Sequence, residues 1–72
     1  MHFNELVNTI KERRDALKVT QEKLAELSGV GLRTLKQFES RKGNPTLLTL
    51  QKISEVLGME VCLKIRKVTT TT

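Results

Sequence analysis

The sequence predicts a mainly α-helical fold, in which four to five short helices are followed by one β-strand. Apolar residues recur three or four positions apart over most of residues 4–57, which is the period of a helix. Residues 59–67 instead alternate strictly between apolar and polar side chains, which is the period of a strand. With 72 residues the chain forms one domain at most. We expect that domain over residues 1–58, the strand over 59–67 and a flexible tail over 68–72.

The small size raises the question of what stabilises the domain, because a core of this size is only marginally stable alone. An internal disulfide is excluded, since Cys62 is the only cysteine. A metal site is not expected either, since His2 is the only histidine and no Cys-x-x-Cys pair occurs. The remaining reinforcement is a partner subunit. Cys62 is then interpreted as a strand side chain rather than a reactive thiol.

Composition narrows the class of function. The net charge of +5 and the pI of about 9.8 favour nucleic acid, since each neutralised phosphate releases a counterion. We expect no enzyme and no cofactor, because no nucleophile lies beside a base and no glycine-rich phosphate loop occurs. Neither a membrane-spanning run nor a signal-peptide pattern is visible, so a cytoplasmic protein that does not bind membranes is expected.

The first helix is expected over residues 4–17, with Asn4 as its N-cap. Arg14 lies on or beside the apolar side of this helix, where an unpaired charge is costly. It therefore needs an acidic partner inside the fold. The apolar side is formed by Phe3, Leu6, Val7, Ile10 and Leu17.

The second helix begins after Thr20, a good N-cap, and ends before Gly29, which suits the left-handed conformation that closes a helix. Val30 is placed to fill the core between this helix and the next. We expect Leu24, Ala25 and Leu27 to form the buried side of the second helix.

The third helix is expected over residues 32–40, and its two sides differ in chemistry. Leu35 and Phe38 point inward, and Glu39 lies on the same side, so Glu39 is the natural partner of Arg14. The opposite side carries donors and two cations but no acid, which is what a surface facing DNA requires. Its residues are Arg33, Thr34, Lys36 and Gln37.

A basic turn over residues 41–45 leads to the fourth helix, which Thr46 caps and which runs through Leu57 until Gly58 ends it. The direction of this turn decides where Arg41 points, so its role stays open. The expected buried residues of the fourth helix are Leu47, Leu50, Ile53 and Leu57.

The expected strand over residues 59–67 is the only strand signal in the chain, so its backbone needs an edge to pair with. The simplest edge is the same strand of a second copy, paired antiparallel across a two-fold axis. The alternative is an extended tail that lies on the helices of its own chain. In a homodimer the interface residues are Met59, Val61, Leu63 and Ile65.

Several spaced motifs agree at once with one known family. The chain resembles the Cro and phage-repressor (XRE-type) helix-turn-helix family from about Leu6 to Gly58. This resemblance implies a lambda-repressor-like helix-turn-helix bundle. It departs from the usual pattern at Gly31, where a serine or threonine cap is common, and at Leu32, which is less polar than most residues there. The matching motifs are Thr20-Gln21-x-x-Leu24-Ala25, Gly29-Val30, Thr34-Leu35, Phe38-Glu39, Asn44-Pro45-Thr46 and Leu50.

The resemblance also implies a site. The third helix would lie in the major groove, with Leu32, Arg33 and Gln37 as the residues that contact bases. The resemblance further implies an ion pair between an arginine of the first helix and the glutamate that ends the third. These residues are Arg14 and Glu39 here. The DNA backbone would be contacted by Gln21, Thr34, Lys36, Lys42 and Asn44.

The expected function is a transcriptional regulator, of the repressor kind, that binds a palindromic operator in double-stranded DNA as a homodimer. A strand directly after the fourth helix resembles the ending of the HipB-like antitoxins. That closer resemblance implies an alternative function, in which the protein also captures a HipA-like kinase toxin and represses its own operon.

Overall fold

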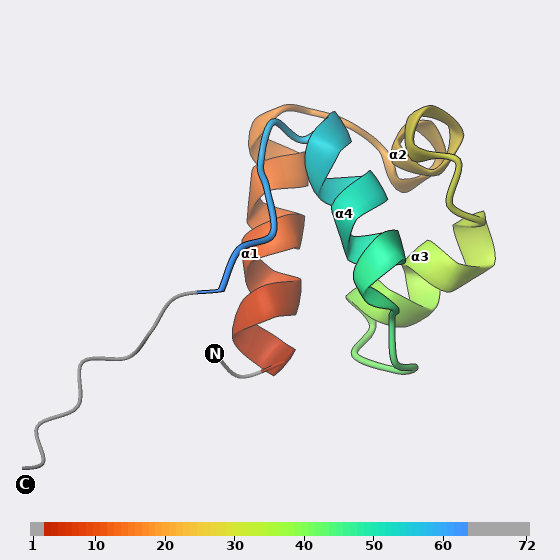
Figure 1. Ribbon diagram of the computed structural model, residues 1–72. Coiled ribbons are helices and arrows are strands. Elements are labelled where there is room, and N and C mark those ends of the chain that lie inside the picture. Colours follow the sequence, from red (N-terminus) through yellow and green to blue (C-terminus); the bar gives the residue numbers. More distant parts are fainter. Residues whose placement is uncertain (1–2, 64–72) are drawn as a thin grey trace, which may run out of the picture.

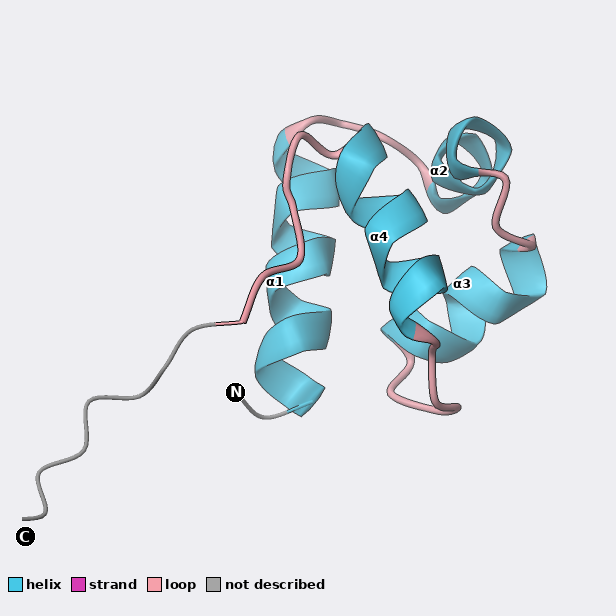
Figure 2. Ribbon diagram, in the orientation of Figure 1, coloured by secondary structure: helices cyan, strands magenta, loops and turns pink. Residues whose placement is uncertain are grey.

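The structure is a computed structural model that describes residues 3–63, and it folds these residues into four α-helices joined by short turns (Figure 1). α2 packs against both α3 and α4, and α3 packs against α1. Figure 2 shows that the described part of the chain contains only helices and loops. The helices are α1 (Phe3–Ala16), α2 (Gln21–Ser28), α3 (Leu32–Glu39) and α4 (Leu47–Val56).

All four helices contribute to one hydrophobic core. Phe38 of α3 is almost fully buried in it, and the ring of Phe3 meets the ring of Phe38 edge-on with the centroids 5.9 Å apart. Val30, between α2 and α3, is buried as the sequence predicts. The buried apolar residues are Val7, Ile10, Leu24, Ala25, Val30, Leu35, Phe38, Ile53 and Leu57.

The ends of α2 and α4 confirm the predicted caps. The hydroxyl of Thr20 accepts a hydrogen bond from the backbone N–H of Lys23 at 3.0 Å, and that of Thr46 accepts one from Thr49 at 3.1 Å. Each bond satisfies a donor that the first turn of a helix leaves free. Gly29 closes α2 with a φ of +76°, which L residues with a side chain rarely adopt.

α1 differs from the prediction at both ends. It begins at Phe3, so Asn4 lies inside the helix rather than at its cap. It ends at Ala16, because Lys18 takes a positive φ of 56° and turns the chain out of the helix. Leu17, expected on the buried side, is therefore exposed at this turn.

Two further leucines expected in the core are exposed, namely Leu27 in α2 and Leu47 in α4. A helix turns by about 100° per residue, so each step of three residues moves a side chain about 60° backwards around the axis. Leu47 precedes buried Ile53 by two such steps and thus lies about 120° away from it. Leu50, one step away, is half-buried. The buried stripe of each short helix is narrower than the run of apolar residues.

The strand expected over residues 59–67 is absent from the part that the structure describes, residues 59–63. Strand pairing needs a second edge, and the single chain offers none there. Residues 59–62 instead lie against α1 (Figure 1), as expected for the alternative of a tail packed on its own helices. The side chain of Leu63 is fully exposed. Ile65 and the tail over 68–72 fall outside the described residues.

A buried ion pair joins the end of α3 to α1, as the sequence predicts. Nε and Nη2 of Arg14 each donate to one carboxylate oxygen of Glu39, both at 2.8 Å. The side chain of Glu39 is only 3% exposed and that of Arg14 13%. Its hydrogen bonds to Glu39 raise the pKa of Arg14 above the ordinary value, so the guanidinium stays charged at any pH at which the domain folds.

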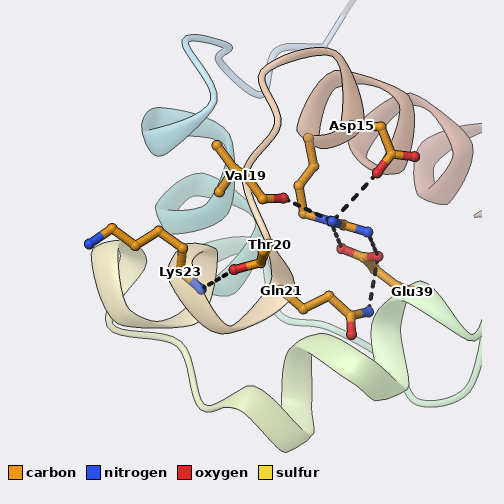
Figure 3. Close-up of polar contacts among 7 residues, drawn as sticks. Asp15, Val19, Thr20, Gln21, Lys23 and Glu39 are labelled. Carbon is orange, nitrogen blue, oxygen red and sulfur yellow. Dashed lines mark hydrogen bonds and ion pairs between the residues drawn. The ribbon is translucent and has the colours of Figure 1, made fainter.

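The same guanidinium also fixes the start of α2. Nη1 of Arg14 donates to the carbonyl oxygen of Val19 at 2.9 Å, and Nε2 of Gln21 donates to Glu39 at 3.1 Å. Figure 3 shows these bonds converging between the helices, with Asp15 at the outer side of the guanidinium. One arginine and one glutamate thus connect α1, α2 and α3.

The two glycines of the turn between α2 and α3 predict opposite responses to one substitution. Gly29→Ser places a side chain at positive φ with open space around it, so it should lower the free energy of unfolding by about 1 kcal/mol through backbone strain alone. Gly31→Ser, the matched control, lies at φ −60° as the N-cap of α3 and should leave stability unchanged or a few tenths higher. Urea titrations measure the free energy of unfolding of both variants. Equal effects of the two substitutions would contradict a left-handed conformation at Gly29.

Removal of Glu39 should destabilise the domain far more than removal of an exposed acid. Glu39→Leu leaves the partly buried Arg14 without its carboxylate and should cost about 3–5 kcal/mol. The matched control is Glu12→Leu at an exposed position of α1, which should stay within about 0.5 kcal/mol of the parent. Urea titration followed by circular dichroism measures both. A cost below about 1 kcal/mol for Glu39→Leu would argue against the structural role of the pair.

Candidate nucleic-acid interface

The outer side of α3 presents the polar residues that the sequence analysis placed there. Leu35, Phe38 and Glu39 are buried, and the four polar residues on the other side are exposed. None of these four has an acidic side chain within ion-pair distance in the part of the chain described. They are Arg33, Thr34, Lys36 and Gln37.

Two hollows border this side of α3 and bring together every expected DNA contact except Gln21. A shallow one is lined by Leu32, Arg33, Lys36, Gln37, Ser40 and Lys42. A smaller one of about 90 Å³ is lined by Thr34, Gln37, Phe38, Lys42, Gly43, Asn44 and Pro45. Gln37 and Lys42 line both hollows, so α3 and the following turn form one continuous surface.

Leu32 stands apart from the other residues expected to contact bases. It is half-buried and packs against the hydrophobic core, although it also borders the shallow hollow. Part of its side chain thus packs the first turn of α3 against the core and is not free to contact DNA. Arg33 and Gln37, by contrast, are exposed.

The turn between α3 and α4 orients its cations in different directions. The backbone N–H of Lys42 donates to the carbonyl oxygen of Gln37 at 2.8 Å, which folds the turn back beside α3. Arg41 takes a positive φ of 65°, and its guanidinium donates to the side-chain oxygen of Asn8 on α1. Arg41 therefore reaches toward α1, whereas Lys42 stays at the hollows of α3.

Two polar contacts from α1 were missed by the sequence analysis. Asn8 holds Arg41, and Nε of Arg13 donates to the carbonyl oxygen of Leu57 at the end of α4, at 2.8 Å. Both side chains are exposed, and nothing in the sequence marks their partners, although Arg13 follows Leu6 by seven residues and thus lies beside the apolar side of α1.

Gln21 occupies the first position of α2, directly after the Thr20 cap. Its amide nitrogen is held by Glu39, as described above, so the side chain has a fixed place at the start of the helix. The N-terminus of a helix favours an anion, because its first backbone N–H groups are free and the helix dipole is positive there. Contact between Gln21 and a phosphate stays a prediction.

The charge of the surface follows from the burial of one acid. Residues 31–46 contain four cations, and Glu39 is their only acid. Because Glu39 is buried and neutralised by Arg14, it adds no negative charge to the surface of α3. A surface that is basic and free of acids attracts the phosphates of a nucleic acid.

Other kinds of site find little support in the described residues. No group of three or more histidine, cysteine, aspartate or glutamate side chains among residues 3–63 is placed to hold a metal ion. None of the described helices has both the length and the apolar character to span a membrane.

Comparison with known proteins agrees with this geometry. Residues 10–63 match the helix-turn-helix family. An uncharacterized HTH-type transcriptional regulator of Methanothermobacter thermautotrophicus is 39% identical over 51 residues, which are 71% of this chain and 74% of that protein. The cryptic phage CTXphi transcriptional repressor RstR of Vibrio cholerae is 38% identical over 56 residues, 72% of this chain and half of the repressor's length.

The family match covers the second half of α1, all of α2, α3 and α4, the capped turns and the basic surface of α3 described above. The motifs that first suggested the resemblance lie within the matched residues. The chain therefore belongs to the Cro and phage-repressor (XRE-type) helix-turn-helix family, whose members are DNA-binding transcriptional regulators.

Proposed function

We propose that this protein is a repressor that binds a palindromic DNA operator in the cytoplasm as a homodimer. The observation that carries the proposal is the exposed side of α3, which has hydrogen-bond donors and cations but no acid. In a helix-turn-helix this is the helix that enters the major groove. The named repressor among the relatives supports repression over activation.

The residues divide by the part of DNA that they would contact. Arg33 can donate two hydrogen bonds to a guanine, and Gln37 can both donate to and accept from an adenine. Leu32 offers only its exposed apolar edge, for instance to a thymine methyl. Thr34, Lys42 and Asn44 line the same hollows and would fix the protein on the phosphates, together with Gln21 at the start of α2.

Dimerisation would take place through residues 59–67. In the part described, Met59 and Val61 are half-buried on α1 beside an apolar hollow of about 200 Å³, which Leu6, Ile10 and Cys62 also line. Leu63 follows directly and is fully exposed, and residues 60–63 have no backbone hydrogen bond within the described chain. A second copy is the proposed occupant, since its own residues 59–67 would supply both the strand edge and the apolar cover.

Such a dimer would place its two α3 helices about 34 Å apart, or a multiple of this distance, so that both read one face of the duplex. The alternative function, a HipB-like antitoxin, adds a HipA-like toxin as a protein partner. Both relatives are named as regulators, so we keep the repressor as the proposed function.

The decisive experiment is the selection of bound sites from a random DNA library with the purified protein at physiological salt. An enriched palindrome is expected, and the spacing of its half-sites tests the dimer geometry. Salt-sensitive binding without any enriched sequence would reject the proposed function.

Arg33→Ala tests the assignment of one base contact. The variant should lose the preference at one position in each half-site, at a cost of about 1–3 kcal/mol for the preferred base, because a forked contact to guanine is removed. Competition binding with single-base variants of the selected site measures this loss. If every position keeps its preference, Arg33 does not contact a base.

Leu63→Asp tests the interface. Because Leu63 is fully exposed in the single chain, the substitution should leave the domain folded but convert the dimer to monomers, as a buried unpaired carboxylate is costly. Analytical ultracentrifugation measures the oligomeric state. The matched control, Leu48→Asp on the exposed part of α4, should stay dimeric. A dimer that persists in Leu63→Asp would refute this interface.

A further inference from the structure

We propose that Lys36, which the sequence analysis placed among the backbone contacts, reads a base beside Arg33, and that each operator half-site therefore carries two guanines. This inference rests on the proposed function, since it concerns how α3 recognises DNA. It changes the recognition set from Leu32, Arg33 and Gln37 to Arg33, Lys36 and Gln37.

The first argument is the direction in which the side chains of α3 leave the helix. At about 100° per residue, the direction opposite to the buried residues Leu35, Phe38 and Glu39 is occupied by Arg33 and Gln37. Lys36 and Thr34 leave the helix on the two flanks of this ridge. The flanks differ, because Lys36 lines the shallow hollow with Arg33, whereas Thr34 lines only the smaller hollow, together with Asn44 and Pro45.

The second argument is the partial burial of Leu32, which leaves room for another side chain to contact a base on its flank of α3. Leu32 lies one turn before Lys36 on the same flank, and it is half-buried against the core. Leu32 and Lys36 line the same shallow hollow, and side chains in a helix lean toward the N-terminus, so the aliphatic stem of Lys36 is placed to extend over Leu32. The ammonium group is thereby carried toward the start of α3, which is the end that approaches the base edges in this kind of motif.

The third argument is hydrogen-bonding chemistry. The lysine ammonium and the arginine guanidinium donate hydrogen bonds and accept none. In the major groove, guanine is the base that presents two adjacent acceptors, O6 and N7. Neither Arg33 nor Lys36 forms an ion pair with another described residue, so both are available for such acceptors. Of Arg33, Lys36 and Gln37, only Gln37 has a side-chain acceptor for a base donor, which suits adenine.

Site selection with two variants of one residue tests the inference. The parent protein should enrich a half-site with two guanines. Lys36→Ala should lose the preference at one of them, by roughly 5- to 150-fold in relative affinity, and keep it at the other. Lys36→Gln should shift the same position from guanine toward adenine, because glutamine both donates and accepts. Circular dichroism melting of each variant checks the fold, which this exposed position should not affect.

Lys42→Ala is the control for a cation at the same surface that contacts phosphate. It should weaken the binding of all sequences alike and make the salt dependence shallower by about one unit of slope. If Lys36→Ala behaves like Lys42→Ala and Lys36→Gln leaves base preference unchanged, Lys36 contacts phosphate and the inference fails, although the proposed function stands. If the parent protein enriches no sequence, the proposed function itself fails.

Discussion

The arrangement of this domain depends on the ion pair between Arg14 and Glu39. The pair brings two charges into a small core, where only complete pairing offsets the loss of hydration. Completeness is visible in the contacts, because both carboxylate oxygens accept from the guanidinium and the remaining nitrogen donates to Val19. Gln21 adds a bond from α2. Helices of eight residues have little independent stability, so this junction fixes the orientation of α3 relative to α1 and α2.

The same junction decides the charge of the candidate DNA surface. Glu39 is the only acid in residues 31–46, and its burial against Arg14 removes it from the side of α3 that faces outward. Structural stability and surface chemistry are thereby linked in one residue. A change at Glu39 would disturb both the position of α3 and the field around it, whereas a change at Arg33 or Lys36 would alter the surface alone.

Size explains why the C-terminal segment matters. The core contains nine buried apolar residues and has neither a disulfide nor, among the described residues, a cluster of metal ligands to reinforce it. Residues 59–62 extend the core along α1 but leave an apolar hollow, and Leu63 has no cover from the described chain. A second copy would reinforce the domain and at the same time supply the second α3 that a palindrome requires.

Local patterns were enough to predict the four helices, the Thr20 and Thr46 caps, the Gly29 stop and the Arg14–Glu39 pair. These features follow from local rules, since spacing and capping chemistry operate within a few residues and a charge on a buried side needs a partner. The same periodicity predicted which residues line the outer side of α3. The exposure of Leu27 and Leu47, the packing of Leu32 against the core and the contact of Arg41 with Asn8 could not be predicted in this way. Those outcomes depend on which side of each short helix packs against its neighbours. For Arg41 they also depend on the positive φ that it adopts in the turn between α3 and α4. The alternation in residues 59–67 predicts a strand, but a pattern cannot supply the second edge that a strand requires.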